Sequence, residues 1–285
     1  MALPTPKENT TAIVTGSSSG IGAEIARQLA RRGHGLTLVA RREDRLKELA
    51  DELAQAHQVR TEVIAADLTD AHSRAELPGQ VEARGLTADI LVNNAGFTTM
   101  GPVHKAERAA ELAMVRTDVE AVVDLCCLFV PGMVTRRRGA VLNTASTAAF
   151  QPLPGQAAYG ASKAFVLSYS RALGAELRGT GVTVTALCPG PVETGFAEAA
   201  GISDEQAGES LPKFMWVPAA DVAKAAVDGL VSGRPVVIPG AANRAAAGLA
   251  HLAPKALILP LLASQHPALK ESWKDSAPEG PPPQG

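Results

Sequence analysis

The chain has few cysteines and no strong excess of charge of either sign. Three cysteines among 285 residues cannot form a disulfide framework, and none has the spacing of a zinc or other metal site. The formal net charge is -2, with lysine and arginine spread along the sequence, so no basic surface for a nucleic acid is predicted. These shortages exclude a disulfide-rich secreted module and argue against a nucleic acid partner.

Hydrophobic runs long enough to span a bilayer are also missing. Residues 1–10 lack the basic and apolar regions of a signal peptide, so we expect a cytoplasmic protein. Residues 245–264 are rich in alanine and leucine but are interrupted by prolines and a lysine. We expect this segment to pack on the domain or on a second subunit. The alternative is that its apolar face lies on a membrane surface, and the scarcity of lysine and arginine there argues against it.

Short apolar runs alternate with helical patterns along the chain. Helical spacing of apolar residues is found after the first and second of these runs, and again over 108–130, 159–177 and 219–230. Strands separated by helices indicate βαβ units. The sequence therefore predicts a single α/β domain with a Rossmann-type, doubly wound, mainly parallel, seven-stranded sheet. The expected strands are 11–15, 36–40, 62–66, 89–93, 140–144, 182–187 and 236–238.

The expected domain covers residues 11–240. Residues 1–10 form a short arm before it, and 241–275 form a helical extension after it. Residues 276–285 are rich in proline and glycine with almost nothing apolar, so we expect a disordered tail.

A glycine-rich loop follows the first expected strand and opens a helix. Gly16 permits a tight turn, Gly20 lets the backbone approach a pyrophosphate, and Gly22 allows the helix and the strand to pack closely. The N–H groups and dipole at the start of a helix favour such an anion. A plain strand-to-helix turn is the alternative interpretation.

The end of the second strand indicates which nicotinamide cofactor binds. NAD sites place an acidic residue there to accept the ribose hydroxyls, but this chain has Ala40 followed by Arg41 and Arg42. A guanidinium suits the 2′-phosphate of NADP in both charge and shape. The later acids, Glu43 and Asp44, fit the first turn of the next helix. We therefore expect NADP(H) in preference to NAD(H).

Tyr159 and Lys163 are separated by one turn of an expected helix and so share a face. A nearby ammonium stabilises a phenolate and lowers its pKa toward neutrality, which would make Tyr159 a general acid and base. The pair alone could equally be a packed ring and a solvated amine.

Taken together, residues 11–238 resemble the short-chain dehydrogenase/reductase family. Residues 15–22 match its TGxxxGIG loop, 93–96 its NNAG segment and 159–163 its YxxxK motif. The remaining matches are the adenine-contacting pair Asp67 and Leu68, the substrate-orienting Ser146, and the PG loop with Pro189, Gly190, Pro191, Val192 and Thr194.

The resemblance implies a role for each matched residue. Tyr159 would exchange a proton with the substrate oxygen, Ser146 would hydrogen-bond that oxygen, and Lys163 would bind the nicotinamide ribose. Residues 193–218 would form a substrate lid, whose aromatic residues suggest an apolar substrate. The cofactor would contact Gly16, Ser18, Ser19, Gly20, Ile21, Gly22, Arg41, Arg42, Asp67, Leu68, Asn94, Ala95, Gly96, Tyr159, Lys163, Pro189, Gly190, Val192 and Thr194.

Asp118 is a departure from the family. Relatives commonly carry an asparagine at this position, thirteen residues before a proline such as Pro131, where it steadies a water in the proton relay to the lysine. Asp118 could preserve the relay, or it could pair with Lys163 and weaken the effect of that ammonium on Tyr159. The relay could also act through the backbone carbonyl and tolerate the change.

These features predict an NADP-dependent oxidoreductase that acts on a small carbonyl or alcohol substrate. The family commonly forms dimers or tetramers, so we expect a homo-oligomer. The alternative is an NADP(H)-binding sensor or regulatory protein of the same fold with little catalysis. The presence of Ser146, Tyr159 and Lys163 together argues against that alternative.

Overall fold

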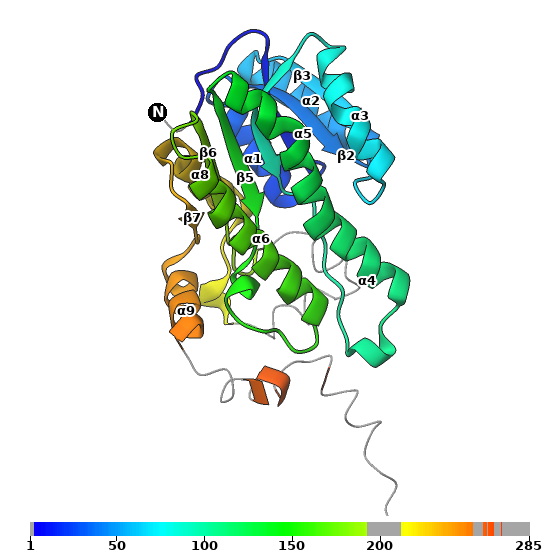
Figure 1. Cartoon of the computed structure of the whole chain (residues 1–285), viewed down its shortest axis with the longest axis vertical. Coiled ribbons are helices and arrows are strands. Elements are labelled where there is room, and N and C mark those ends of the chain that lie inside the picture. Colours follow the sequence, from blue (N-terminus) through cyan, green and yellow to red (C-terminus); the bar gives the residue numbers. More distant parts are fainter. Residues whose placement is uncertain (1–2, 193–211, 253–258, 261, 265–268, 270–285) are drawn as a thin grey trace, which may run out of the picture.

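The computed structural model describes residues 3–192, 212–252, 259–260, 262–264 and 269 (Figure 1). Its strands are β1 (Thr10–Thr15), β2 (Gly35–Ala40), β3 (Thr61–Ala65), β4 (Thr87–Asn93), β5 (Gly139–Thr144), β6 (Val182–Leu187) and β7 (Val236–Val237). Its helices are α1 (Gly20–Ala30), α2 (Glu43–His57), α3 (Ala71–Glu82), α4 (Arg108–Val115), α5 (Ala121–Thr135), α6 (Ala157–Glu176), α8 (Ala219–Ser232) and α9 (Ala241–Leu252). Within the described part of the chain, no helix has both the length and the apolar character needed to cross a bilayer.

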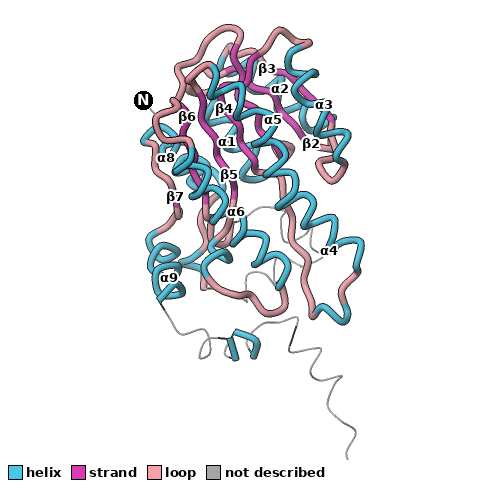
Figure 2. Tube along the Cα trace, viewed as in Figure 1, coloured by secondary structure: helices cyan, strands magenta, loops and turns pink. Residues whose placement is uncertain are grey.

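The strands form one parallel sheet in the order β3-β2-β1-β4-β5-β6-β7 (Figure 2). The chain moves outward in one direction from β1 to β3, then crosses back and continues from β4 to β7. This reversal makes β1 and β4 neighbours at the switch point of a doubly wound sheet, where such folds bind ligands. The predicted seven-stranded α/β sheet is confirmed.

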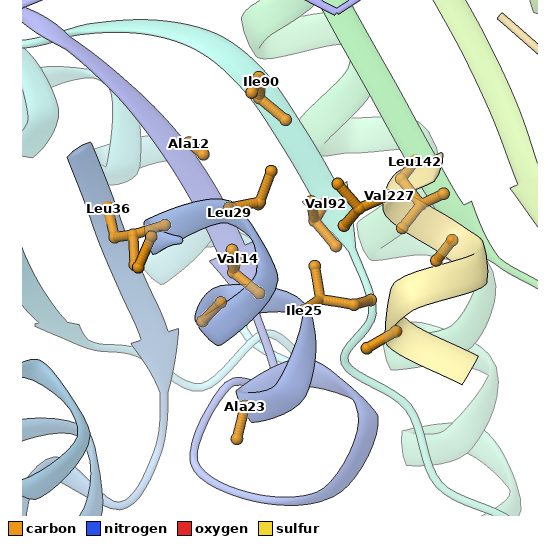
Figure 3. Packing of buried hydrophobic residues seen from close by; sticks show 14 of the residues in the cluster. Ala12, Val14, Ala23, Ile25, Leu29, Leu36, Ile90, Val92, Leu142 and Val227 are labelled. Carbon is orange, nitrogen blue, oxygen red and sulfur yellow. The ribbon is translucent and has the colours of Figure 1, made fainter. Parts of the chain in front are cut away.

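Helices cover both faces of the sheet. On one face, α1, α2 and α8 pack over the strands, and Figure 3 shows Ile25 and Leu29 of α1 in one cluster with Val92 of β4 and Val227 of α8. On the other face, α3, α5 and α6 enclose a second core that includes Leu77, Phe129 and Met133. Because both faces are covered, the central strands are apolar on both sides.

The segment before β5 differs from the expected single helix over 108–130. The helical chain changes to π-helical pairing at Arg116–Glu120, named η2, and then continues as α5 to Thr135 with Pro131 inside it. Pro131 does not end the helix, although proline is expected to disturb one. The helix continues for about one more turn after it, to Thr135. The π segment places an extra residue in one turn, which changes the direction of the side chains around it.

Helix α3 has no counterpart among the expected elements. Its sequence contains Pro78 and has no clear apolar stripe, so periodicity gives no helical signal. The helix is fixed at its start by Asp70, whose carboxylate accepts hydrogen bonds from the backbone N–H groups of His72 (3.1 Å) and Ser73 (3.2 Å).

Candidate functional site

The candidate site residues follow the carboxyl ends of the strands. The glycine loop follows β1, Asn94 follows β4, Ser146 follows β5, and the loop that begins at Pro189 follows β6. Since all strands are parallel, these segments meet at one edge of the sheet. This edge faces the lower part of Figure 1, where α6 begins and where α4 and α9 extend beyond the strands.

The glycine loop has the conformation that its sequence requires. Gly16 has a φ of +65°, which favours glycine. A side chain at Gly22 would place its Cβ 2.4 Å from the Gly16 carbonyl oxygen. Asn94 holds the loop from the neighbouring strand, because its amide donates to the carbonyls of Thr15 (3.1 Å) and Gly16 (3.4 Å). The expected close packing of helix, loop and strand is therefore present.

The start of α1 fits a phosphate group. Its N-cap residue, Ser19, has an extended backbone and makes no side-chain hydrogen bond to the helix. The first N–H groups of α1 therefore have no side-chain acceptor, and the helix dipole is directed at the same place. The Ser17 hydroxyl is buried there and lacks a hydrogen-bond partner. This donor set matches the pyrophosphate of a dinucleotide.

Arg42 lies against the same loop. Its guanidinium donates to the hydroxyls of Ser18 and Ser19, at 3.0 Å each. The arginine and the two hydroxyls are exposed and lie together after β2, where the 2′-phosphate of NADP is expected. Arg41 is exposed as well, but Arg42 is the one that contacts the loop. The local geometry thus fits NADP and favours Arg42 within the expected pair.

Asp67 and Leu68 occupy the turn after β3. The Asp67 carboxylate accepts hydrogen bonds from the backbone N–H and the hydroxyl of Thr69, both at 2.9 Å. Leu68 is buried in the core, and its carbonyl accepts a hydrogen bond from Arg74 at 2.8 Å. The turn is therefore held by hydrogen bonds on both of its residues, and its adenine-contacting role stays a prediction.

Tyr159 and Lys163 share one face of α6, as expected. The Lys163 ammonium lies 5.6 Å from the centre of the Tyr159 ring. Lys163 is buried, whereas Tyr159 is partly exposed. The ammonium also donates to the Thr144 carbonyl at the end of β5, at 3.2 Å. The amine is thus fixed by protein groups beside the phenol.

Asp118 pairs directly with Lys163. One carboxylate oxygen of Asp118 (Oδ2) lies 2.9 Å from the Lys163 Nζ, and the other (Oδ1) accepts a hydrogen bond from the Phe97 N–H at 3.1 Å. Asp118 lies in η2 and is 1% exposed. A Cβ at Gly96 would approach Asp118 Oδ1 to 2.7 Å, so glycine is needed where this backbone crosses the pair. Of the three alternatives for Asp118, the structure has the ion pair.

Tyr159 is less acidic than its lysine neighbour suggests. Burial raises the pKa of Tyr159 above its ordinary value, and this effect exceeds the lowering by Lys163. Asp118 adds to the increase, whereas a hydrogen bond with Ser146 opposes it. Lys163 lowers the Tyr159 pKa, as expected, but in the protein without cofactor burial and Asp118 outweigh the ammonium, so the net shift is upward and not toward neutrality.

The loops after β5 and β6 are tied to one another. Ser146 begins the short 3-10 helix η3 (Thr147–Phe150), where its hydroxyl accepts from the Ala148 N–H at 3.1 Å. The Thr147 N–H donates to the Pro189 carbonyl at 2.9 Å. This bond holds the serine and the PG loop at a fixed separation.

Some expected site residues lie outside the described residues. They are Thr194, Phe196 and the rest of 193–211, which belong to the expected lid. The expected tail, 276–285, also lies outside the described residues. The end of the lid is described: Phe214 and Met215 lie in the 3-10 helix η5 (Lys213–Met215), and Phe214 is 75% exposed. The expected helical extension after residue 240 begins with α9.

Three residues, Arg74, Asn243 and Gln156, make polar contacts that were not expected from the sequence. The Arg74 guanidinium is buried and joins the Leu68 carbonyl to Glu120 and to Asp124, whose Oδ2 lies 2.5 Å from the Arg74 Nε. Asn243 of α9 is 0% exposed and donates to the Met215 carbonyl at 2.9 Å.

The Asn243 side chain also lies close to Gly190. A Cβ added at Gly190 would lie 2.4 Å from the amide oxygen of Asn243. Gln156 donates to the Thr98 hydroxyl at 2.7 Å and so links the start of α6 to the segment after β4. Arg74, Asn243 and Gln156 belong to none of the motifs found in the sequence.

Comparisons with known proteins agree with this geometry. A model of the short chain dehydrogenase family matches residues 10–204. A short chain dehydrogenase of Pseudocercospora fijiensis is 39% identical over 186 residues, which cover 65% of this chain and 60% of that relative. The chain thus spans less than two thirds of that relative's length.

Two further proteins match over most of their length. The NADP-dependent 3-hydroxy acid dehydrogenase of Salmonella typhi is 35% identical over 221 residues, which cover 75% of this chain and 86% of the relative. The solved structure of a short-chain dehydrogenase from Sphingobium yanoikuyae in complex with NADPH superposes with a TM-score of 0.74 and 31% identity, and the match covers 95% of this chain and 98% of that one.

Proposed function

This chain belongs to the short-chain dehydrogenase family, and from that membership we propose that it is an NADP(H)-dependent oxidoreductase with Tyr159 as general acid and base. Its substrate is a small carbonyl compound or the corresponding alcohol. The observation that carries the proposal is the position of Tyr159 beside Lys163, at the edge of the sheet where the glycine loop and Ser146 also lie. The 3-hydroxy acid dehydrogenase relative, which is NADP-dependent, supports the cofactor assignment.

NADPH, when bound, supplies the hydride for the carbonyl carbon. The N–H groups at the start of α1 would hold its pyrophosphate, and Arg42 with Ser18 and Ser19 would hold its 2′-phosphate. Lys163 uses one N–H for the Thr144 carbonyl and faces Asp118 with another. A third remains to bind a ribose hydroxyl.

Tyr159 gives its phenolic proton to the carbonyl oxygen in the reductive direction. Ser146 donates a hydrogen bond to that same oxygen and so polarises the carbonyl. Lys163 stabilises the phenolate that remains until a proton from solvent restores the phenol. In the oxidative direction the phenolate removes the alcohol proton. The protein therefore supplies position, charge and one proton.

The substrate surface is proposed to be largely apolar. The described end of the lid includes the exposed Phe214 and the partly exposed Met215 and Trp216. On α9, Leu249 is 70% exposed. Exposed large apolar residues near a candidate site favour an apolar ligand. An acid substrate, as in the Salmonella relative's name, is the alternative that a screen has to include.

A screen for turnover tests the proposed function. Purified protein is mixed with NADPH and a panel of apolar ketones, aldehydes and 3-oxo acids, and the loss of NADPH absorbance is followed. We expect reduction of at least one carbonyl class, with NADH a poorer donor. The NADP(H) sensor alternative predicts tight NADPH binding without turnover of any member of the panel.

A cytoplasmic homo-oligomer is also part of the proposal. Apolar side chains of Leu112 and Val115 on α4 and Phe165 on α6 are exposed, and the two helices are in contact. Neighbouring apolar residues on a surface support an interface between copies. The low cysteine content fits a reducing compartment.

Exchange of Arg42 for aspartate is expected to reverse the cofactor preference. The substitution removes a charge-assisted contact to the 2′-phosphate and introduces an acceptor for ribose hydroxyls. The ratio of kcat/KM for NADPH to that for NADH should fall by about 10- to 100-fold, as expected for one such contact. Arg41→Asp is the matched control, because it makes the same charge change one residue away. A larger effect of Arg41→Asp would assign the phosphate to Arg41 instead.

A further inference from the structure

We propose that Asp118 keeps Tyr159 in its proton-donating form by offsetting the positive charge of Lys163, so that the enzyme reduces carbonyls over a wide pH range but oxidises alcohols only at alkaline pH. The inference rests on the proposed function and assigns Asp118 as a positioning residue that acts through Lys163. It is carried by the contact of Asp118 with Lys163, the burial of both side chains, and the chemistry of the groups around the carboxylate.

The carboxylate fits the two donors that face it. Asp118 Oδ1 faces the Phe97 N–H at 3.1 Å, and Oδ2 faces the Lys163 ammonium at 2.9 Å. Both neighbours are donors, and the carboxylate offers an acceptor oxygen to each of them. An asparagine or a protonated acid would direct a donor at one of them. Burial raises the pKa of Asp118, whereas Lys163 and the Phe97 N–H oppose the increase and favour the carboxylate form.

Lys163 is the link between the carboxylate and the phenol. Burial lowers the pKa of Lys163, but the attraction of Asp118 and Tyr159 more than offsets this and raises it above its ordinary value. The ammonium therefore stays charged, while the negative charge beside it cancels part of its field at the phenol. The result is a lysine that holds its position strongly but acidifies Tyr159 only weakly.

The other titratable groups near the cluster do not change this balance. Cys188, which follows β6, is buried, and burial raises its pKa to about 12, so it is neutral at physiological pH. The positive charge of Arg171 on α6 opposes this increase in the Cys188 pKa but does not cancel it. The segment after β4 offers the Phe97 N–H, and the end of β5 offers the Thr144 carbonyl and the Ser146 hydroxyl, all of them uncharged.

A high phenol pKa affects the two directions differently. In reduction the carbonyl carbon accepts a hydride, with its two electrons, from NADPH, and the carbonyl oxygen accepts the proton as the Tyr159 O–H bond breaks. This direction requires the phenol, which is the form that Asp118 favours. Alcohol oxidation requires the phenolate. The overall equilibrium is fixed by the reactants, so Asp118 acts on the pH dependence of each direction.

The chain offers a direct test because Tyr159 and Tyr169 are its two tyrosines. Tyrosinate absorbance is titrated in the wild type and in Tyr159→Phe, without cofactor and with NADP⁺, and the difference reports Tyr159 alone. Burial also raises the pKa of Tyr169 well above its ordinary value, so the titration of Tyr159→Phe is needed to identify the Tyr169 transition. In the cofactor-free wild type, we expect Tyr159 to titrate no lower than an ordinary tyrosine, near pH ~10. A clearly lower midpoint would overturn the proposal without any need for a variant at Asp118.

Asp118→Asn should then lower the Tyr159 midpoint by about one pH unit or more, the size expected for removal of a nearby charge. The alkaline rise of kcat/KM for alcohol oxidation should move to lower pH by the same amount. Asp228→Asn is the control, because it removes a carboxylate from an exposed ion pair on α8. An unchanged or higher midpoint in Asp118→Asn would refute the proposal. The titration does not depend on turnover, so failure of the substrate screen is distinguishable from failure of this inference.

Discussion

Tyr159→Phe is expected to lower kcat for carbonyl reduction by at least about 100-fold and by up to about 10,000-fold, the range for loss of a general acid. The substitution removes one oxygen and leaves the ring, so the cleft and Lys163 keep their places. NADPH affinity should change by no more than about twofold. Initial rates are measured from NADPH absorbance, and the affinity is measured from the fluorescence of bound NADPH.

Tyr169→Phe is the matched control for this prediction. Tyr169 lies on the same helix as Tyr159, but its ring is stacked on Phe165, with centroids 5.9 Å apart and planes at 9°. It should retain nearly full activity. Full activity in Tyr159→Phe would show that another group donates the proton. A large loss of NADPH binding in that variant would assign Tyr159 to cofactor binding instead of proton transfer.

Local sequence patterns predicted the sheet because each strand and its neighbouring helix carry their own periodicity. The glycine loop was predictable for a similar reason, since Gly16 and Gly22 fulfil conformational and packing requirements that few other residues meet. Helix α3 was missed because it contains Pro78 and lacks an apolar stripe. Its position depends on contacts that only the folded chain brings together.

The unexpected site contacts also join residues that lie far apart in the sequence. Arg74 meets Asp124 from α3, and Asn243 reaches back to Met215 from the C-terminal side of the domain. No local spacing reveals such partners. The pKa of Tyr159 could not be predicted either, because its largest cause is burial, and burial depends on the whole fold. The family resemblance identified Asp118 as unusual, but only the structure shows its ion pair with Lys163.

Lys163→Met should have the largest effect on stability of the substitutions considered, because it leaves the Asp118 carboxylate buried without its cation. Breaking one partner of a buried ion pair costs about 3–5 kcal/mol of unfolding free energy. Activity should also be lost, since the phenolate and the ribose lose their ammonium. Urea unfolding gives the stability, and Lys224→Met gives the control. Lys224 pairs with Asp228 at the surface, at 2.8 Å, and its loss should cost less than about 1 kcal/mol.

Adding Asp118→Asn to Lys163→Met separates the effect of Lys163 on stability from its effect on catalysis. In Lys163→Met with Asp118→Asn, the buried charge is gone, and the asparagine oxygen still accepts from the Phe97 N–H. Most of the lost stability should return, but the activity should not.

The pH dependence of the single variant gives a further check. Burial raises the pKa of Asp118 above that of the unfolded chain, so the folded state of Lys163→Met binds the extra proton. Its stability deficit should therefore be smallest in acid, below the pKa of Asp118 in the unfolded chain, and grow as the pH rises through the folded pKa. A deficit that is independent of pH, or that persists in the double variant, would mean that Lys163 stabilises the fold by packing and that the charge of Asp118 is neutralised by some other group.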